Sequence, residues 1–547
     1  MAYIKAQKII RDKNGVIISG SASIIESEYI PDARYHSKKH VREKLGKVLY
    51  LSEDKKSDIF LSPVRGLVRY DAQTDSFSPV DHEDPCLKSN PQFPEPQIHT
   101  VFGDVYLLLE FMEKTGLLTL FRDVFTEKKL FEKVLIHILH DVLALGSHIG
   151  CDDFMASSFA SYLFEDLPIS SLRSDPGYYE KMGDDSLRVN FFRCFVKIMK
   201  QETMADLGSS PEFGKGCYVD STPLPNEIRN LMSNAYCSHG TAGSCMQTRM
   251  YLVLDDKTDL PVWYGLTPGN VLDLNTINTI ISDTFVSVGV EIDSMVLDAG
   301  YITKDFLIRY RQEDEKSFIG KSPRKRGFQF KTRYNEVKHL IPNAKYEIFR
   351  NGKAYFAYKK STELFGIRLW SYIYVDQKNA LDWHTDYVQN HYEEYQKMSD
   401  KDKNWHRIKN GFFILLSNKD EGCADILDQY IERVDIEHMF KSAKGFGNLL
   451  PLSRWTKTKV DGKIFSEMIV TIVILLLRKK LIPNRYSLPD FAGKPRSLMC
   501  FKDQNDNVII ECPNKQVKEI YRVFDVKIPS SLHLSEYKKK IYGTIGE

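Results

Sequence analysis

The spacing of apolar residues changes several times along the 547-residue chain, and each change predicts a different kind of structure. Residues 1–95 alternate polar and apolar side chains as strands do, and Asn14-Gly15 favours a two-residue hairpin turn. After a Pro-rich linker at 89–97, residues 98–205 change to helical spacing, as in VYLLLEFMEKTGLLTLFRDVF. His137 and His140 lie on one of these predicted helices, where we expect core histidines rather than ligands. The first 205 residues therefore predict a small β-rich module followed by an α-helical domain.

Between residues 216 and 320 the pattern predicts three strands, a helix, a strand, a helix and a fifth strand. The first strand, in GCYVDSTPL, is expected to end near Asp220, and the fourth, in IDSMVLDAG, at Asp298. Thr303 is a predicted N-cap for the second helix. This is the element order of an RNase H-like α/β fold, in which the first and fourth strands are neighbours.

Later segments interrupt and then complete this core. The stretches YEIFRNGKAYFAYKK and IRLWSYIYVD predict antiparallel strands, so residues 323–410 are interpreted as a β-rich insertion. The apolar run from Met468 to Leu477 is too short to span a bilayer and predicts a buried helix. The expected organisation is a β-rich module at 1–95, an α-helical domain at 98–205, an RNase H-like core at 210–322 and 411–482, the insertion at 323–410, and a C-terminal region at 483–547 that contacts DNA or a second subunit.

Composition narrows the class of protein. A content of 42% hydrophobic and 27% charged residues is ordinary for a folded soluble chain, so disorder is not expected. Seventy-five basic against 73 acidic residues leave a formal charge of +2, so a nucleic-acid site must be a local patch. Nine cysteines without a paired CxxC favour a reduced, intracellular setting. No signal peptide is expected from MAYIKAQKII, because it lacks a basic region followed by an apolar one.

Two basic segments are candidates for such a patch. Residues 34–47 hold six basic side chains against Glu43 alone, and are either a solvated loop or a DNA contact. Residues 321–338 hold seven basic side chains against Glu336 alone, with interleaved aromatic residues. This second composition favours phosphate binding, with a solvated loop as the alternative. The candidate DNA-binding residues here are Lys321, Arg324, Lys325, Arg326, Lys331 and Arg333.

Candidate chemistry lies in two aspartates and one later segment. If residues 430–447 are helical, Tyr430, Arg433, Glu437 and Lys444 fall within about 60° of one another and form one polar stripe. Neighbouring strands would bring Asp220 and Asp298 into one site, and Glu437 would join them from the helix. Three carboxylates without histidine or cysteine suit Mg²⁺ or Mn²⁺, and two such ions about 4 Å apart can promote in-line phosphoryl transfer. The alternatives without catalytic function are a turn-forming residue at Asp220, a loop residue at Asp298 and a surface helix with ordinary ion pairs.

The spacing of Tyr430, Arg433, Glu437 and Lys444 resembles the Tyr-Arg-Glu-Lys signature of bacterial insertion-sequence transposases of the DDE class, in the IS-four-like superfamily. YVDST resembles the first-aspartate strand of that family and VLDAGY its second, and a long β-rich insertion before the Glu is typical of this subgroup. Two positions depart from the pattern: Val434 follows the motif Arg where hairpin-forming relatives can carry an aromatic residue, and Lys463 follows Gly462 where a His is often found.

The resemblance implies that Asp220, Asp298 and Glu437 bind two Mg²⁺ or Mn²⁺ ions and that Tyr430, Arg433 and Lys444 contact DNA phosphates near the scissile bond. It implies a transposase that cuts double-stranded DNA at the ends of its element and joins the 3′ ends to target DNA. A homodimer in the cytoplasm, associated with the nucleoid and not with a membrane, is the expected form. The alternatives are a metal-dependent nuclease without strand transfer and a catalytically silent DNA-binding regulator.

Overall fold

The computed structural model divides the chain into two compact units, Met1–Ile98 and His99–Glu547. It describes residues 2–545 except 12–16, 30–36, 82–83, 88–98, 145–149, 165–175, 202–205, 229–230, 238–244, 271–276, 311–315, 433–451, 453–455 and 504. Each unit has its own hydrophobic core.

The first unit is one antiparallel sheet of six strands paired in chain order. Its strands are β1 (Ala2–Arg11), β2 (Ile17–Tyr29), β3 (Ser37–Tyr50), β4 (Asp58–Ser62), β5 (Gly66–Asp71) and β6 (Ser76–Pro79). β1 and β2 pair antiparallel as the sequence predicted, although the Asn14-Gly15 turn between them lies outside the described residues. Apolar side chains from neighbouring strands, such as Ile24 of β2, Val48 of β3 and Phe60 of β4, are buried and form the core of this unit.

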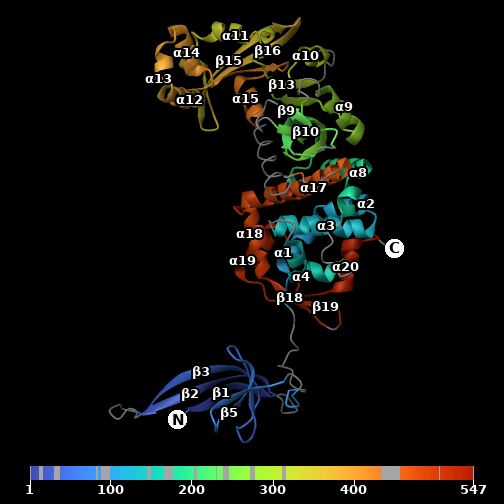
Figure 1. Ribbon diagram of the computed structural model, residues 1–547, viewed down its shortest axis with the longest axis vertical. Helices are drawn as coiled ribbons and strands as arrows, with labels where there is room; N and C mark the ends of the chain where they lie inside the picture. The colour runs from blue at the N-terminus through green and yellow to red at the C-terminus, as the bar shows by residue number, and fades with distance from the viewer. Residues whose placement is uncertain are drawn as a thin grey trace. The chain divides into compact units, whose positions relative to one another are not determined.

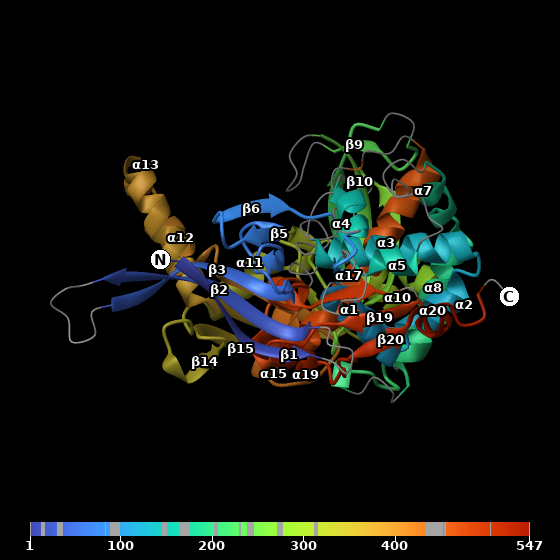
Figure 2. The same cartoon turned by 90° about the horizontal axis from the view of Figure 1, so that it is seen from below.

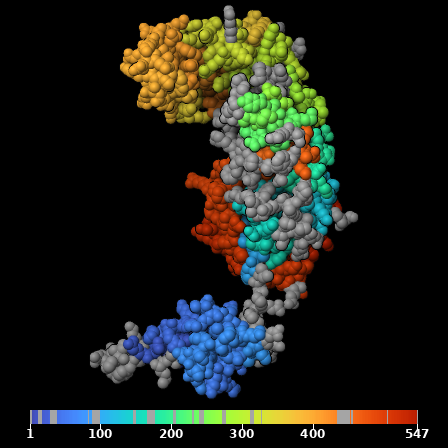
Figure 3. Space-filling view, in the orientation of Figure 1, coloured from blue at the N-terminus to red at the C-terminus, as the bar shows by residue number. Residues whose placement is uncertain are grey.

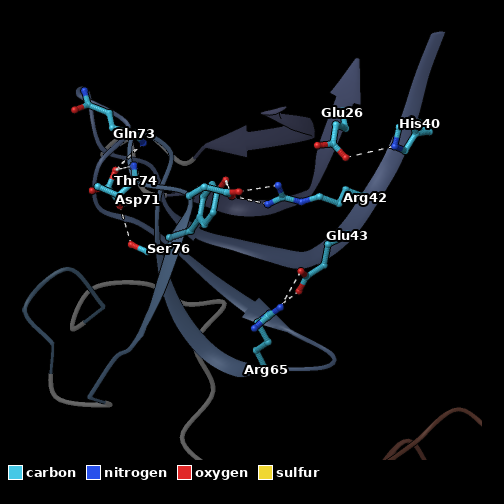
Figure 4. Close-up of polar contacts among 11 residues, drawn as sticks. Glu26, His40, Arg42, Glu43, Arg65, Asp71, Gln73, Thr74 and Ser76 are labelled. Carbon is cyan, nitrogen blue, oxygen red and sulfur yellow. Dashed lines mark hydrogen bonds and ion pairs between the residues drawn. The ribbon is translucent and has the colours of Figure 1, made fainter. Parts of the chain in front are cut away.

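The first basic segment is largely a strand rather than the loop considered above, since Ser37–Tyr50 forms β3. Its register against β2 places Lys38 opposite Glu28 and Lys44 opposite Ser23. Arg42 donates to Asp75 at 2.7 Å, and Glu43 accepts from Arg65 at 2.7 Å (Figure 4). The Arg42 side chain raises the acidity of its partner, because their hydrogen bond lowers the pKa of Asp75 to about 2. Arg42 therefore has a partner within this sheet.

The second unit begins with a layer of helices. They are α1 (Gly103–Lys114), α2 (Leu117–Val124), α3 (Lys128–Leu143), α4 (Cys151–Ser157), α5 (Ala160–Leu163), α7 (Pro176–Met182) and α8 (Asp185–Met199). The Asp184 carboxylate accepts from the backbone N–H of Ser186 and caps α8. Of these helices, α3 and α7 pack against α17 (Lys457–Leu481), and α17 lies beside α3 in Figure 1 and in Figure 2. The predicted buried helix at Met468–Leu477 is confirmed as part of α17.

A mixed sheet of ten strands follows. Its path is β11-β10-β8-β12-β13-β17-β16-β15-β14, with β9 paired to β10 at the side. The first five strands in space are β11 (Pro261–Pro268), β10 (Cys245–Asp255), β8 (Gly216–Pro225), β12 (Ser294–Leu297) and β13 (Ser317–Lys321), and β9 is Ala235–Cys237. β8 is antiparallel to β10 and parallel to β12, and β12 is parallel to β13. The prediction that the first and fourth strands of this segment are neighbours is confirmed.

Helices α9 (Ile277–Val288) and α10 (Lys304–Tyr310) lie between these strands in the chain, as the sequence predicted. The Thr303 hydroxyl accepts from the N–H of Phe306 at 2.9 Å, which confirms the expected cap of α10. The structure is thus a mixed α/β fold.

Residues 323–410 contribute strands to this same sheet. The strands β14 (Glu347–Arg350), β15 (Lys353–Leu364) and β16 (Ile367–Asp376) pair antiparallel and join β17 (Phe412–Ser417), which pairs with β13. The segment is not made of strands alone. It also holds α11 (Phe330–Val337), α12 (Gln377–Asn390), α13 (Tyr392–Gln396) and α14 (Asp400–Ile408). In the space-filling view, these yellow and orange residues form one continuous surface (Figure 3).

The last residues return to the helices near residue 100. They form α18 (Leu488–Gly493), β18 (Met499–Lys502), β19 (Asn507–Ile510), α19 (Lys515–Val523), β20 (Ser531–His533) and α20 (Leu534–Tyr542). β18 pairs with β7 (Thr100–Val101), and the Tyr521 hydroxyl donates to the carbonyl of Gly103 at 2.6 Å. The C-terminal region and the helical layer therefore share one core. Within the described residues, no helix is both long and apolar enough to cross a membrane.

Candidate functional site

Asp220 lies on β8, and Asp298 is the first residue after β12, the parallel strand that pairs with β8. β12 pairs with β8 so that Leu297 faces Val219, and Asp298 directly follows Leu297 as Asp220 follows Val219. Adjacent strands are about 4.8 Å apart, so the two aspartates occupy adjacent positions at one level of the sheet. Both side chains are half-buried. The arrangement brings two carboxylates together at one place on the surface of the sheet.

One detail of the sequence prediction is wrong. β8 does not end near Asp220, because it continues to Pro225 with Thr222 and Leu224 paired to β10. The physical reason is that β12 stops opposite Val219, while β10 continues. The later residues of β8 therefore pair with β10 alone and form an edge of the sheet. A proline at such an edge position removes no ladder hydrogen bond. Pro223 is therefore compatible with a strand and does not mark a turn.

Lys321 belongs to the same level of the sheet. β12 pairs with β13 so that Leu297 faces Gly320, and continuing this parallel register by one residue places Lys321 beside Asp298. The order across the three strands is therefore Asp220, Asp298, Lys321. A cation next to two carboxylates reduces their mutual repulsion and supplies positive charge for a phosphate at the sheet edge.

Tyr430 comes to this site from helix α15 (Cys423–Glu432). Ile426 and Leu427 are fully buried and fix one face of α15 on the core. About one turn further along α15, the Tyr430 hydroxyl lies 3.5 Å from Oδ1 of Asp298. The Tyr430 ring stacks on Phe413 of β17 with ring centroids 6.3 Å apart. The structure thus places one residue of the predicted stripe directly at the second aspartate.

The remaining residues of the stripe lie outside the described part of the chain. They are Arg433, Glu437 and Lys444, and Val434 lies there as well. The last described residue of α15, Glu432, accepts a hydrogen bond from the Tyr218 hydroxyl at 3.2 Å. Tyr218 is two residues before Asp220 on β8, on the same face of the strand. The chain therefore leaves the described region next to the strand that carries Asp220.

The other predicted DNA-binding residues have different surroundings. Lys325 and Lys331 are exposed, and Arg326 begins a short 3-10 turn, Arg326–Phe328. Arg324 donates to the carbonyls of Lys409 at 3.1 Å and Phe412 at 3.3 Å.

Arg333 is enclosed within the fold. Its exposed fraction is 6%, and it donates to Glu336 at 2.9 Å and to Gln329 at 2.8 Å. These contacts occupy its guanidinium inside the protein, so Arg333 has a structural role here.

Sequence reasoning missed Arg249 and Glu432. Arg249 lies on β10 and donates to the Ser221 hydroxyl at 2.8 Å, beside Asp220. Asp220 itself accepts from the N–H of Ser221 at 2.8 Å. An arginine directly before the apolar stretch MYLVL of a predicted strand was a signal that could have identified this position. These contacts fix the backbone and side chains around the first aspartate.

The donor set fits a hard divalent cation. Asp220 and Asp298 offer carboxylate oxygens at adjacent positions, and their half-buried surroundings leave one side open for water or phosphate oxygens. A second group of metal-ligating side chains, His137, Asp141 and Glu467, lies in the helical core.

Comparison with known proteins bears on the same segment. Residues 212–465 match the family model described as the transposase DDE domain. The matched segment contains Asp220, Asp298 and Tyr430, and it supports a DDE transposase. Among solved structures, the chain is similar to the piggyBac transposase in a cryo-EM synaptic complex with hairpin DNA, at 10% identity and a TM-score of 0.34, covering 81% of this chain and 85% of that chain. No curated protein sequence matches the chain significantly.

Proposed function

We propose that this protein is a DNA transposase that cuts double-stranded DNA at the ends of its insertion sequence and joins the freed 3′ ends to target DNA. The observation that carries the proposal is the pair Asp220 and Asp298, adjacent on parallel strands within the segment that matches the transposase DDE domain. The Tyr-Arg-Glu-Lys subgroup is part of the proposal, supported by the position of Tyr430 against Asp298.

In this proposal Asp220, Asp298 and Glu437 hold two Mg²⁺ or Mn²⁺ ions. When bound, two such ions activate the attacking oxygen and stabilise the leaving oxygen of an in-line displacement at phosphorus. The protein supplies the positions. β8 and β12 fix the two aspartates, and the Tyr430 hydroxyl lies 3.5 Å from Oδ1 of Asp298. Glu437 follows α15 by five residues and completes the set of carboxylates.

Positive side chains next to the carboxylates would hold the DNA backbone. Lys321 is at the level of Asp298, and Lys325 and Lys331 are exposed on the segment that follows it. Arg433 and Lys444 are expected to bind phosphates nearer the scissile bond. We expect a homodimer during the reaction, because two DNA ends must be held together before both are joined to one target.

The proposal is tested with the full-length purified protein, Mg²⁺ and DNA that carries the sequences flanking its gene. The wild type should release 3′ ends and join them to a second duplex, and Asp298→Asn should abolish both steps while binding of the ends persists. Asp305→Asn is the matched control, since Asp305 is an exposed acid on α10, seven residues from Asp298; it should cut and join as the wild type does.

The other two functions give different results. Cleavage by the wild type without joining would identify a metal-dependent nuclease. Specific binding without cleavage under any divalent ion would identify a DNA-binding regulator. Either result would overturn the proposed activity.

A further inference from the structure

A buried polar cluster joins two helices of the second unit. His137 and Asp141 lie one turn apart on α3, and Glu467 lies on α17. His137 Nε2 is 3.5 Å from Oδ2 of Asp141 and 3.6 Å from Oε1 of Glu467. One ligand atom from each of the three side chains lies within 4.8 Å of the other two. Three metal-ligating groups therefore converge from segments more than 300 residues apart in the chain.

The cluster is closed to solvent. The side chains of His137, Asp141 and Glu467 are exposed by 1%, 0% and 1%. Placing two carboxylates next to each other in such a core is unfavourable unless a positive charge compensates them.

The distances distinguish metal ligation from direct hydrogen bonding. Charge-assisted N–H···O bonds are about 2.7–2.9 Å long, so contacts of 3.5 and 3.6 Å are too long for imidazolium–carboxylate bonds. In a tetrahedral Zn²⁺ site with bonds of about 2.0 Å, ligand atoms are about 3.3 Å apart. The separations from Nε2 to the two carboxylate oxygens are therefore close to the edges of such a tetrahedron.

Neighbouring groups hold the ligands in orientation. His140 Nδ1 is 2.7 Å from Oδ1 of Asp141, which leaves Oδ2 directed at His137. The rings of Tyr178 and Tyr179 pack on the His137 imidazole, with centroids 5.7 and 6.3 Å away. A partner for each ligand outside the metal is the usual construction of protein metal sites.

We propose that His137, Asp141 and Glu467 bind one divalent transition-metal ion, preferentially Zn²⁺, that fastens α3 to α17. An imidazole nitrogen with two carboxylates favours Zn²⁺ over Mg²⁺. The site is structural, because its ligands are closed to solvent and none of them belongs to the Asp220–Asp298 pair. It is independent of the proposed transposase activity and stands or falls separately from it.

A metal-free cluster is the competing arrangement. Lys463 lies close enough to influence the charge of His137, and its exposed fraction is 6%. A protonated Lys463 together with a protonated His137 would balance the two carboxylates without any ion. Such a cluster would hold no metal, and its stability would not respond to a chelator.

Metal content decides between the two arrangements. The full-length protein carrying Asp220→Asn and Asp298→Asn, which removes the proposed catalytic ligands, is purified without added metal and analysed by plasma mass spectrometry. We expect about one Zn²⁺ per chain, a lower Tm after extraction with a chelator, and recovery on adding Zn²⁺. Replacement by Co²⁺ should produce visible absorption bands stronger than those of octahedral Co²⁺. A folded protein without bound metal, whose Tm is the same with Zn²⁺ and with chelator, would overturn the proposal.

Variants locate the ion. In the same background, Glu467→Gln should lower the retained Zn²⁺ at least tenfold and remove the response of Tm to Zn²⁺. The matched control is Glu132→Gln, because Glu132 is likewise a buried glutamate but lies outside the cluster, where it accepts a hydrogen bond from the Tyr542 hydroxyl. It should retain the metal. If Glu467→Gln does not fold, the Co²⁺ spectrum of the parent protein still decides, and an octahedral spectrum or none contradicts the site. Equal Zn²⁺ content in Glu467→Gln and its parent would also refute it.

Discussion

Gly462→Ala should destabilise the second unit, because α7 and α17 touch backbone to backbone at this residue. A Cβ built on Gly462 would lie 1.8 Å from the carbonyl oxygen of Tyr179 and 2.7 Å from the N–H nitrogen of Gly183. Ordinary contact begins at 3.4 Å, so the helices must separate by about 1.6 Å. A second close approach lies beside the first, because a Cβ on Gly183 would lie 1.9 Å from the carbonyl oxygen of Thr458. The backbones of the two segments are therefore in contact at two glycines.

The expected magnitude is a balance of two effects. Alanine in an open helix interior is about 1 kcal/mol more favourable than glycine. Overpacking a core typically costs about 1–3 kcal/mol, and the cost is at the upper end or above it when the obstacle is backbone. We therefore expect Gly462→Ala to lower the free energy of unfolding by about 2 kcal/mol or more.

The assay is thermal unfolding of the full-length variant, together with amide hydrogen exchange across α7 and α17. Gly493→Ala is the matched control, because Gly493 is the last residue of α18 and a Cβ there would meet nothing within 4 Å. The control should leave Tm unchanged or raise it. Exchange in α7 and α17 should accelerate only in Gly462→Ala. A Gly462→Ala variant as stable as the wild type would refute the close approach of these helices.

Three further outcomes are expected. Arg333→Ala should lower the free energy of unfolding by about 1–3 kcal/mol, because it removes a buried guanidinium bonded to Glu336. Lys331 is exposed, so Lys331→Ala should leave Tm unchanged but weaken DNA binding. DNA titrations at several salt concentrations should show a smaller salt dependence for this variant. Burial raises the pKa of the Asp104 carboxyl from 3.8 to about 6, so the folded state binds this proton more tightly than the unfolded state does. The stability that Asp104 contributes is therefore fully present below pH 3.8 and is lost as the pH rises through about 6. Asp104→Asn should therefore flatten the decline of Tm over that interval. Tyr430→Phe should slow DNA cleavage more than it weakens DNA binding, which parallel cleavage and binding assays on one DNA would measure.

Local pattern was sufficient for the strands that position the two aspartates. SMVL is a short apolar run that ends at Asp298, and the helix after it begins at the Thr303 cap, so both boundaries have a signal in adjacent residues. The end of β8 was different. Pro223 has the appearance of a turn residue, and only the length of the neighbouring strand β12 decides that it lies on a strand edge.

Contacts between distant residues left no local signal. The pairing of β7 with β18 joins positions about 400 residues apart, and neither short strand is distinctive by itself. The same holds for Arg333, whose burial depends on the packing of α11 and not on its place in a basic run. The charge pattern predicted that Arg333 binds phosphate. In the structure its guanidinium instead donates to Glu336 and Gln329, three and four residues away in the same segment.

The central claim is that Asp220 and Asp298 share a divalent-metal site, and anomalous X-ray scattering from crystals soaked in Mn²⁺ tests it most directly. We expect Mn²⁺ peaks in contact with carboxylate oxygens of both aspartates, with Glu437 as the third carboxylate, and loss of the peak next to β12 in Asp298→Asn. Mn²⁺ bound elsewhere, or bound by either aspartate without the other, would contradict the account.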